Sequence, residues 1–270
     1  MEKVRTPLFW LLVLSLAGCS PRGETRSPVL RHEPRSLTRT YGSCDSAGGP
    51  CVSIRFSYPA ITRPGSTPAA DSVGAYVDGE MFAALEDGER TLPFDSIASG
   101  LIDQYSGLRE EFSDYRIPWT LERSCVILLD TAGVISVRFE EASFLGGAHG
   151  LEIVRLASFD AASGRRLAYG DFFKPGFERE FARLTEREFR AARDIPDSSS
   201  LGEAGFWIEE GEFSPPQNMA VGDSALILYY NPYEVAPYAM GPTEVHIPFR
   251  TLSGLFRTDG ALAGFTSSLQ

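Results

Sequence analysis

The chain has 270 residues, of which 43% are hydrophobic and 11% aromatic, so it can bury a sizeable core and is not an intrinsically disordered protein. Beyond residue 40, 18 basic side chains face 33 acidic ones and give a net charge of about −15. Such a field repels nucleic-acid phosphates and attracts cationic partners, although solubility alone also accounts for it. The composition therefore excludes nucleic acid as an expected partner.

The N-terminus has the pattern of a bacterial lipoprotein signal. Lys3 and Arg5 precede the apolar segment 8–17, and small residues lead to Cys19. As a helix this segment would rise only about 15 Å, half of the roughly 30 Å that a membrane-spanning helix crosses. We therefore expect it to be an export signal and not a membrane anchor. We expect cleavage before Cys19 and a lipid anchor on its thiol; an ordinary secretory signal is the alternative. Ser20, in place of an aspartate, favours the periplasmic side of an outer membrane.

The remaining cysteines predict one disulfide and no metal site. Residues 20–43 hold prolines and spaced arginines without apolar periodicity, which predicts a flexible tether. Cys44 and Cys51 flank a turn-forming run, so we expect them to pair in an oxidising compartment. Cys125 lies in an apolar run and should be a buried, inert thiol. Because no CxxC pair or HxxxH step occurs, we expect neither a metal nor a cofactor.

Apolar periodicity predicts the elements that follow. Alternation over 51–58 indicates a half-buried strand that Pro59 ends. Amphipathic helices should follow over 70–86 and 97–112, the second with Asp95 as its N-cap. We expect further strands over 119–129, 134–143, 151–159, 225–230 and 243–249, and helices around 177–189 and 252–256. This clustering predicts an α+β fold, with antiparallel sheets packed against amphipathic helices in two closely packed subdomains.

One histidine stands out as a candidate for chemistry. His149 lies in the run Gly146-Gly147-Ala148-His149-Gly150, whose glycines permit positive φ angles or a close approach of the backbone to a ligand. The imidazole either caps backbone groups at a bend between two strands or contacts a ligand. His32 lies in the expected tether, and His246 should occupy the outward face of its strand.

A second candidate surface is the segment 229–242, which holds four tyrosines, three prolines and a methionine in fourteen residues. Prolines reduce the entropy cost of ordering a loop, and tyrosines present rigid amphipathic rings, a combination that suits the recognition of proteins or sugars. Packing over the sheet is the alternative. The residues expected to contact a ligand or partner are Gly146, Gly147, His149, Tyr233, Tyr238 and Met240.

No pattern of residues indicates catalysis. The chain lacks the GxSxG and SxxK patterns of serine nucleophiles and the GxGxxG and GxxxxGK patterns of phosphate-binding loops. Neighbouring carboxylates such as Glu140 and Glu141 carry little weight in an acidic protein. We therefore assign no catalytic residue and do not expect an enzyme.

Several motifs resemble the C-terminal module of RsiV-type anti-sigma factors. They are the glycine run 146–150, Ser158-Phe159-Asp160, 163–167, Asp171-Phe172-Phe173, 233–241 and 245–249. Residues 52–59 and the helices up to Trp119 are similar to the smaller domain that precedes this module there and in PdaC-type polysaccharide deacetylases. The resemblance covers about residues 50–258. The expected division is a signal peptide at 1–19, a tether at 20–43, a PdaC-like subdomain at 44–145, an RsiV-like module at 146–258 and a tail at 259–270.

The resemblance implies an extracytoplasmic module that binds rather than catalyses, in a family whose RsiV members are receptors for lysozyme, a cationic protein. We expect neither the sigma-binding and membrane-spanning segments of an anti-sigma factor nor the TFDDGP-like metal-binding motif of the deacetylases. The leading hypothesis is a lipid-tethered envelope protein that binds a cationic muramidase or a cell-wall glycan. The alternatives are a peptidoglycan hydrolase that uses His149 beside carboxylates, and a purely structural envelope lipoprotein.

Overall fold

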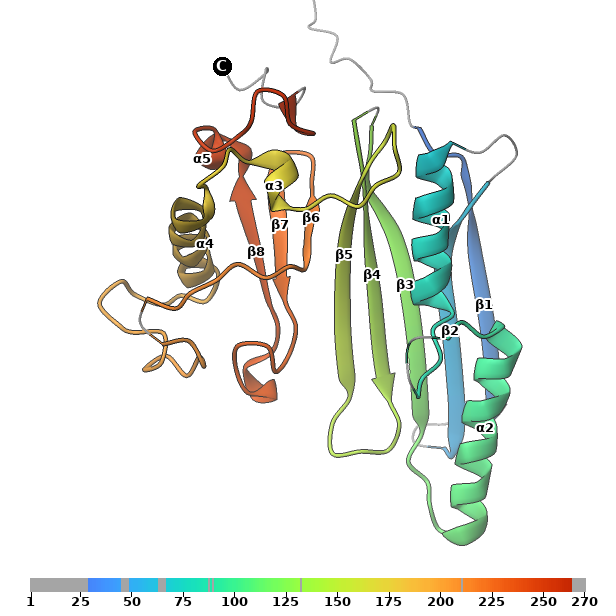
Figure 1. The fold of residues 1–270 in the computed structure, drawn as a ribbon. Helices are drawn as coiled ribbons and strands as arrows, with labels where there is room; N and C mark the ends of the chain where they lie inside the picture. Colours follow the sequence, from blue (N-terminus) through green and yellow to red (C-terminus); the bar gives the residue numbers. More distant parts are fainter. Residues whose placement is uncertain are drawn as a thin grey trace, which may run out of the picture.

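The computed structural model describes residues 29–44, 49–62, 67–86, 88, 90–131, 133–209 and 211–263. The expected signal peptide and Cys19 lie outside these residues. The described part contains two β-sheets, each with helices on one face (Figure 1), which confirms the predicted α+β class. None of its helices has both the length and the apolar character needed to cross a bilayer.

The first sheet has five strands in the order β1-β2-β3-β4-β5. They are β1 (His32–Gly42), β2 (Cys51–Ile61), β3 (Trp119–Asp130), β4 (Val134–Phe144) and β5 (Leu151–Asp160). The β2–β3 pair is parallel and the other pairs are antiparallel. Parallel neighbours need a long crossover, and here α1 (Pro68–Met81) and α2 (Phe94–Glu111) provide it and cover one face of the sheet.

The second sheet has three antiparallel strands in the order β6-β7-β8. They are β6 (Met219–Val221), β7 (Ala225–Tyr230) and β8 (Thr243–Pro248). The amphipathic helix α4 (Glu178–Ala192) buries Phe181, Leu184 and Phe189 against the outer face of this sheet. The short helices α3 (Tyr169–Phe172) and α5 (Phe249–Leu252) complete the same core, and η1 (Tyr238–Met240) lies between β7 and β8.

The two sheets meet at β5. A small apolar cluster between them contains Val154, Leu156, Ala220, Ile227 and Tyr229. Polar links also join the sheets, because the Val221 N–H donates to Ser158 Oγ at 2.9 Å and Arg138 on β4 pairs with Glu244 on β8 at 2.7 Å. The two halves of the fold are therefore held together by direct contacts in addition to the chain between them.

The structure corrects the expected tether. Residues 32–42 form strand β1, paired along its whole length with β2. All but one of its residues are exposed, so its sequence shows no apolar alternation, and the pairing with β2 holds the strand. Likewise, β2 does not end at Pro59 but continues to Ile61, where it still pairs with β1. Pro59 faces Pro34 of β1 and lies beyond Ser57, the last residue of β2 that pairs with β3. No backbone N–H is therefore needed from Pro59 on the side that faces β3.

Other boundaries also shift. Asp95 is not the N-cap of α2: that position is Pro93, which makes no side-chain cap, and the Asp95 carboxylate instead bonds Arg39 of β1. The first helix ends at Met81 rather than near 86, since the chain turns there into a bridge between Ala83 and Thr91. The expected boundary at 145/146 precedes β5, although β5 belongs to the first sheet.

The cysteine predictions are confirmed for the described residues. Cys44 and Cys51 form a disulfide. Cys125 is free and only 3% exposed, and burial raises the pKa of its thiol to about 12. A thiol with this pKa is almost entirely protonated at neutral pH and is a poor nucleophile.

Candidate functional site

The glycine loop and the tyrosine loop meet at one end of the molecule. The first joins β4 to β5 and the second joins β7 to β8, and both loops lie at the lower end in Figure 1. The ring of His149 stacks on that of Tyr238 with a centroid distance of 3.8 Å and an interplanar angle of 18°. The Tyr233 hydroxyl lies 3.2 Å from His149 Nε2. We call His149, Tyr233 and Tyr238 the ring cluster.

The hydrogen bonds of His149 define its tautomer. Its Nδ1 lies 2.8 Å from the carbonyl oxygen of Gly150. Because a carbonyl oxygen only accepts, Nδ1 donates, and in the neutral ring Nε2 then accepts from the Tyr233 hydroxyl. The imidazole is thus oriented by its own loop and by the tyrosine loop. His149 thus caps a backbone group, the first of its two expected roles, and its side chain is exposed.

Tyr233 has a backbone conformation that residues other than glycine rarely adopt. Its φ is +69° and it is 53% exposed. A hydrogen bond from the Glu234 N–H to the Asn231 carbonyl and another from Asn231 Nδ2 to Glu234 Oε1, both at 3.1 Å, close the turn around it. Positive φ is costly for a bulky residue and persists only where its surroundings impose it. Such outliers concentrate at functional sites, which supports a role in binding.

The glycines of the first loop have different roles. Gly146 has a φ of +81°, and a Cβ there would lie 2.0 Å from the Tyr115 hydroxyl and 2.8 Å from Trp119 Nε1. Trp119 Nε1 donates to that same hydroxyl at 3.0 Å, so Gly146 seats the loop on an aromatic pair. A Cβ on Gly147, in contrast, would meet only the His149 carbonyl oxygen, at an ordinary contact distance of 3.8 Å. Gly146 therefore shapes the loop, and the structure does not bring it into the ring cluster.

Met240 also lies apart from the ring cluster. It is partly buried against the core of the second sheet, and its Sδ would lie 3.2 Å from a Cβ placed on Gly205. Its carbonyl accepts a hydrogen bond from Arg193 Nη2 at 2.7 Å. Met240 therefore packs partly against this core, and its contact with a ligand or partner stays a prediction.

Three exposed apolar residues near the ring cluster were not anticipated. Leu145 and Leu151 flank the glycine loop and are 37% and 43% exposed. Trp207 is 58% exposed, and its backbone N–H donates to the carbonyl of Val235 in the tyrosine loop at 2.8 Å. Exposed apolar side chains that gather at one end of a protein mark interaction sites. The sequence signal for Trp207 was a single tryptophan in a glycine-rich loop, and an analysis of apolar periodicity does not detect such a residue.

Two carboxylates are close in sequence to residues of the ring cluster. Glu152 follows Leu151 and Glu234 follows Tyr233, and both are exposed. Aromatic faces together with carboxylates attract cationic groups. Within the described ranges, no three His, Cys, Asp or Glu side chains are placed to hold a metal ion. His246 is exposed as predicted, with Nε2 2.6 Å from Glu244, whereas His32 begins β1 and is not part of a tether.

Comparison with known proteins identifies a domain of unknown function. Residues 170–250 match the family described as protein of unknown function DUF3298. The chain is also 22% identical over 125 residues to the peptidoglycan-N-acetylmuramic acid deacetylase PdaC of Bacillus subtilis, a match that covers 46% of this chain and 26% of PdaC. The chain thus spans about a quarter of the length of that relative.

Solved structures share the fold. A DUF3298 family member from Bacteroides fragilis superposes with a TM-score of 0.68 at 18% identity, covering 90% of this chain and 99% of that one. A DUF3298 family protein from Pseudomonas aeruginosa gives a TM-score of 0.55 at 19% identity, over 84% and 95% of the two chains. At these identities the likeness establishes the fold alone.

Proposed function

We propose that this protein is a lipid-tethered recognition protein of the cell envelope, which binds its partner through the ring cluster and does not catalyse a reaction. The observation that carries the proposal is the stack of His149 on Tyr238 beside an exposed Tyr233 with positive φ. Rigid aromatic side chains supply contact area at low conformational-entropy cost. A cluster of them imposed on a strained turn is the arrangement expected of a binding surface.

The envelope location draws on three observations. A DUF3298 domain is present, the chain has weak similarity to a protein named for acting on peptidoglycan, and the Cys44–Cys51 disulfide suits an oxidising compartment. The proposed lipid anchor is on Cys19, and it would hold the protein on the periplasmic side of the outer membrane. Metabolic labelling with an alkyne analogue of palmitate tests it: labelling of wild type and its loss in Cys19→Ser are expected, and labelling that survives this substitution would exclude the anchor.

The partner that fits best is a cationic muramidase of the lysozyme class, as expected of an RsiV-like module. The net charge beyond residue 40 is about −15, and Glu152 and Glu234 are close in sequence to residues of the ring cluster. A cell-wall glycan, whose sugar rings would stack on Tyr233 and Tyr238, is the second partner to test.

Calorimetric titration with a cationic lysozyme at low and physiological salt tests the partner. Tyr233→Ala and Tyr238→Ala should each weaken binding by about 2 kcal/mol, as for aromatic anchors at the centre of an interface. Tyr41→Ala is the matched control, because Tyr41 is 39% exposed on the opposite edge strand. Absence of heat at low salt would remove the muramidase; binding of purified glycan strands that needs both tyrosines would identify the glycan instead.

The hydrolase alternative needs a carboxylate that is hydrogen-bonded to His149. The two ring nitrogens are engaged by Gly150 and Tyr233, and the ring face by Tyr238. We therefore favour binding, and expect no soluble fragments when the protein is incubated with purified peptidoglycan. Release of fragments that His149→Ala abolishes would replace this proposal with an enzyme.

A further inference from the structure

A second feature lies at the opposite end of the first sheet, where β2 and β3 separate. Their pairing stops at Ser57 and Ser124, although β2 continues to Ile61 and β3 to Asp130. A β-bulge between Ile127 and Leu129 bends β3 there. Within the described residues, no strand pairs with the β2-facing edge of β3 beyond Ser124. We call this opening the β2–β3 split.

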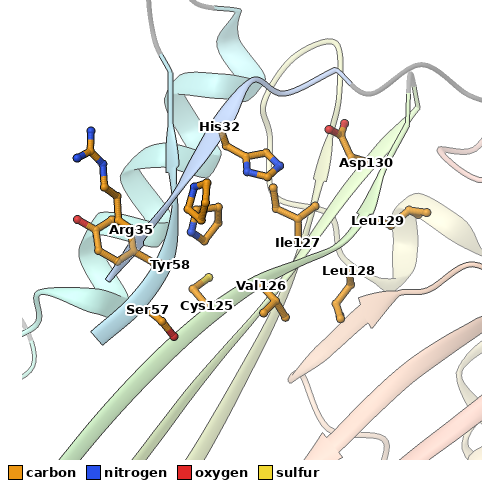
Figure 2. Close-up of a pocket in the computed structure, with 12 residues that line it drawn as sticks. His32, Arg35, Ser57, Tyr58, Cys125, Val126, Ile127, Leu128, Leu129 and Asp130 are labelled. Carbon is orange, nitrogen blue, oxygen red and sulfur yellow. The ribbon is translucent and has the colours of Figure 1, made fainter. Parts of the chain in front are cut away.

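The split holds a cavity of about 550 Å³ (Figure 2). Its lining residues are His32, Pro34, Arg35, Ser57, Tyr58, Pro59 and the six consecutive residues 125–130. Most of this lining is apolar: Cys125 and Ile127 lie on one side of the β3 ribbon, and Val126 and Leu128 on the other. Val126 is 49% exposed, an unusual fraction for a β-branched residue inside a strand of a five-stranded sheet.

We propose that the β2–β3 split binds an extended peptide segment of another protein, which adds as a strand along the free edge of β3. Backbone N–H and C=O groups at a strand edge need hydrogen-bond partners. An acyl chain fills an apolar cavity but supplies no such partners, whereas an extended peptide supplies them along its length and offers alternate side chains to the walls. The free edge of six residues is about 20 Å long, enough for a strand of typical length.

Arg35, on the β1 side of the split, suits an acidic residue at one end of the peptide. Arg35 and His32 lie on the β1 side, and the Arg35 side chain is 60% exposed with Glu33 as a loose partner at 3.7 Å. The Asp130 carboxylate is already engaged, because it accepts the N–H groups of Val29 and Leu30 at 2.8 and 3.1 Å. The chain's own segment 20–28 leads to this point but is polar and contains two prolines, a poor match to an apolar strand site. The occupant we infer is therefore a separate chain.

Fluorescence anisotropy tests the proposal with a labelled synthetic peptide, acetyl-Asp-Val-Thr-Val-Thr-Val-amide. Wild type should bind it saturably, and Val126→Glu should weaken binding at least about tenfold, because a charge then enters the apolar wall. Glutamate avoids placing a like charge opposite Arg138, the β4 partner of Val126. The control is Ile117→Glu, at a residue 42% exposed outside the split, which should bind as wild type does.

Two measurements on the wild-type protein keep the test independent of how the variants fold. Bound peptide should slow hydrogen exchange of the amides of 125–130 and shift the methyl NMR signals of Val126, an exposed residue among the lining residues. Absence of saturable binding, or equal binding by Val126→Glu, would overturn the proposal. A shift of the Val126 methyl signals with oleate but not with the peptide would assign the cavity to a lipid. Concentration-dependent dimerisation that the peptide does not reverse would assign it to a second copy, and both outcomes refute a peptide site.

Discussion

The carboxamide of Asn218 pairs with Leu156 as a neighbouring strand would. Its Oδ1 accepts the Leu156 N–H at 2.7 Å, and its Nδ2 donates to the carbonyl of Val154 at 2.8 Å. Asn231 adds a second amide on the same strand, with the Val154 N–H donating to its Oδ1 at 2.7 Å. The outer edge of β5 is therefore closed by side chains and not by a sixth strand.

Removing the Asn218 amide should uncap this edge. Asn218→Ala leaves the Leu156 N–H without its partner, at a cost of about 1–3 kcal/mol in the free energy of unfolding, whereas the Val154 carbonyl keeps a hydrogen bond from Asn231 Nδ2 at 3.1 Å. Urea unfolding measures the loss, and light scattering should detect the aggregation that a free edge promotes. Gln217→Ala, at the exposed neighbouring residue, should change neither quantity. Equal stability of the two variants would show that the amide is dispensable.

Gly146 and Gly147 should respond differently to alanine. A Cβ at Gly146 would meet the Tyr115 hydroxyl at 2.0 Å on a backbone with φ of +81°, so Gly146→Ala should lower the unfolding free energy by at least about 1–3 kcal/mol. A Cβ at Gly147 would lie 3.8 Å from its nearest neighbour, the His149 carbonyl oxygen, so Gly147→Ala should leave the unfolding free energy almost unchanged. Thermal melting of both variants measures this. If Gly147→Ala were the more damaging change, the loop would not depend on its contact with Tyr115.

The buried Arg123 should be essential to the first half of the fold. It pairs with Glu141 at 2.7 Å, donates to the carbonyls of Met81 and Ala83 at the C-terminal end of α1, and its side chain is 3% exposed. Arg123→Met leaves the partly buried Glu141 unpaired and should cost about 3–5 kcal/mol. Arg183→Met, which breaks an exposed pair with Glu180, should cost under about 1 kcal/mol. Comparable midpoints of urea unfolding for the two variants would contradict this account.

The link between Arg138 and Glu244 should depend on pH. Burial opposes ionisation of Glu244, but hydrogen bonds from Arg138 and His246 outweigh it and hold the pKa of Glu244 below its ordinary value of 4.5. A group with a lowered pKa stabilises the folded state above its unfolded pKa, and this stabilisation is lost as the pH falls through the folded pKa.

Glu244→Gln should therefore reduce stability at pH 7, and the difference from wild type should shrink as the pH falls below 4.5. Denaturant titrations between pH 3 and pH 7 measure this, with Glu212→Gln on an exposed loop as the control. A difference that stays constant over this range would mean that the charge of Glu244 does not contribute.

Periodicity predicted the elements that bury one face. Helix α4 and strand β7 lie where their apolar residues indicate, because Phe181, Leu184 and Phe189 recur at helical spacing and 225–230 is a continuous apolar run. Strand β1 was missed because its partner strand, rather than a buried face, holds it in place. The helix predicted to 86 ends at Met81 because Ala84 and Leu85 continue the apolar pattern inside a turn.

The ring cluster could be predicted only in parts. His149 and Tyr233 were each singled out by local composition, but they lie 84 residues apart and no local pattern indicates that they touch. Met240 was grouped with the tyrosines by composition, which does not show that its side chain packs against the core of the second sheet. The β2–β3 split depends on where two parallel strands diverge, which is a property of register and not of sequence pattern.

The parallel pairing of β2 with β3 also bears on how the chain reaches its native state. The hairpin of β1 and β2 and the meander of β3, β4 and β5 consist of contacts between near neighbours in sequence. Joining them requires α1 and α2 to close a loop whose entropy cost precedes any gain from the new ladder. We therefore expect this docking to limit the refolding rate, so that substitutions at the Val52–Trp119 end slow folding while those in the meander mainly accelerate unfolding.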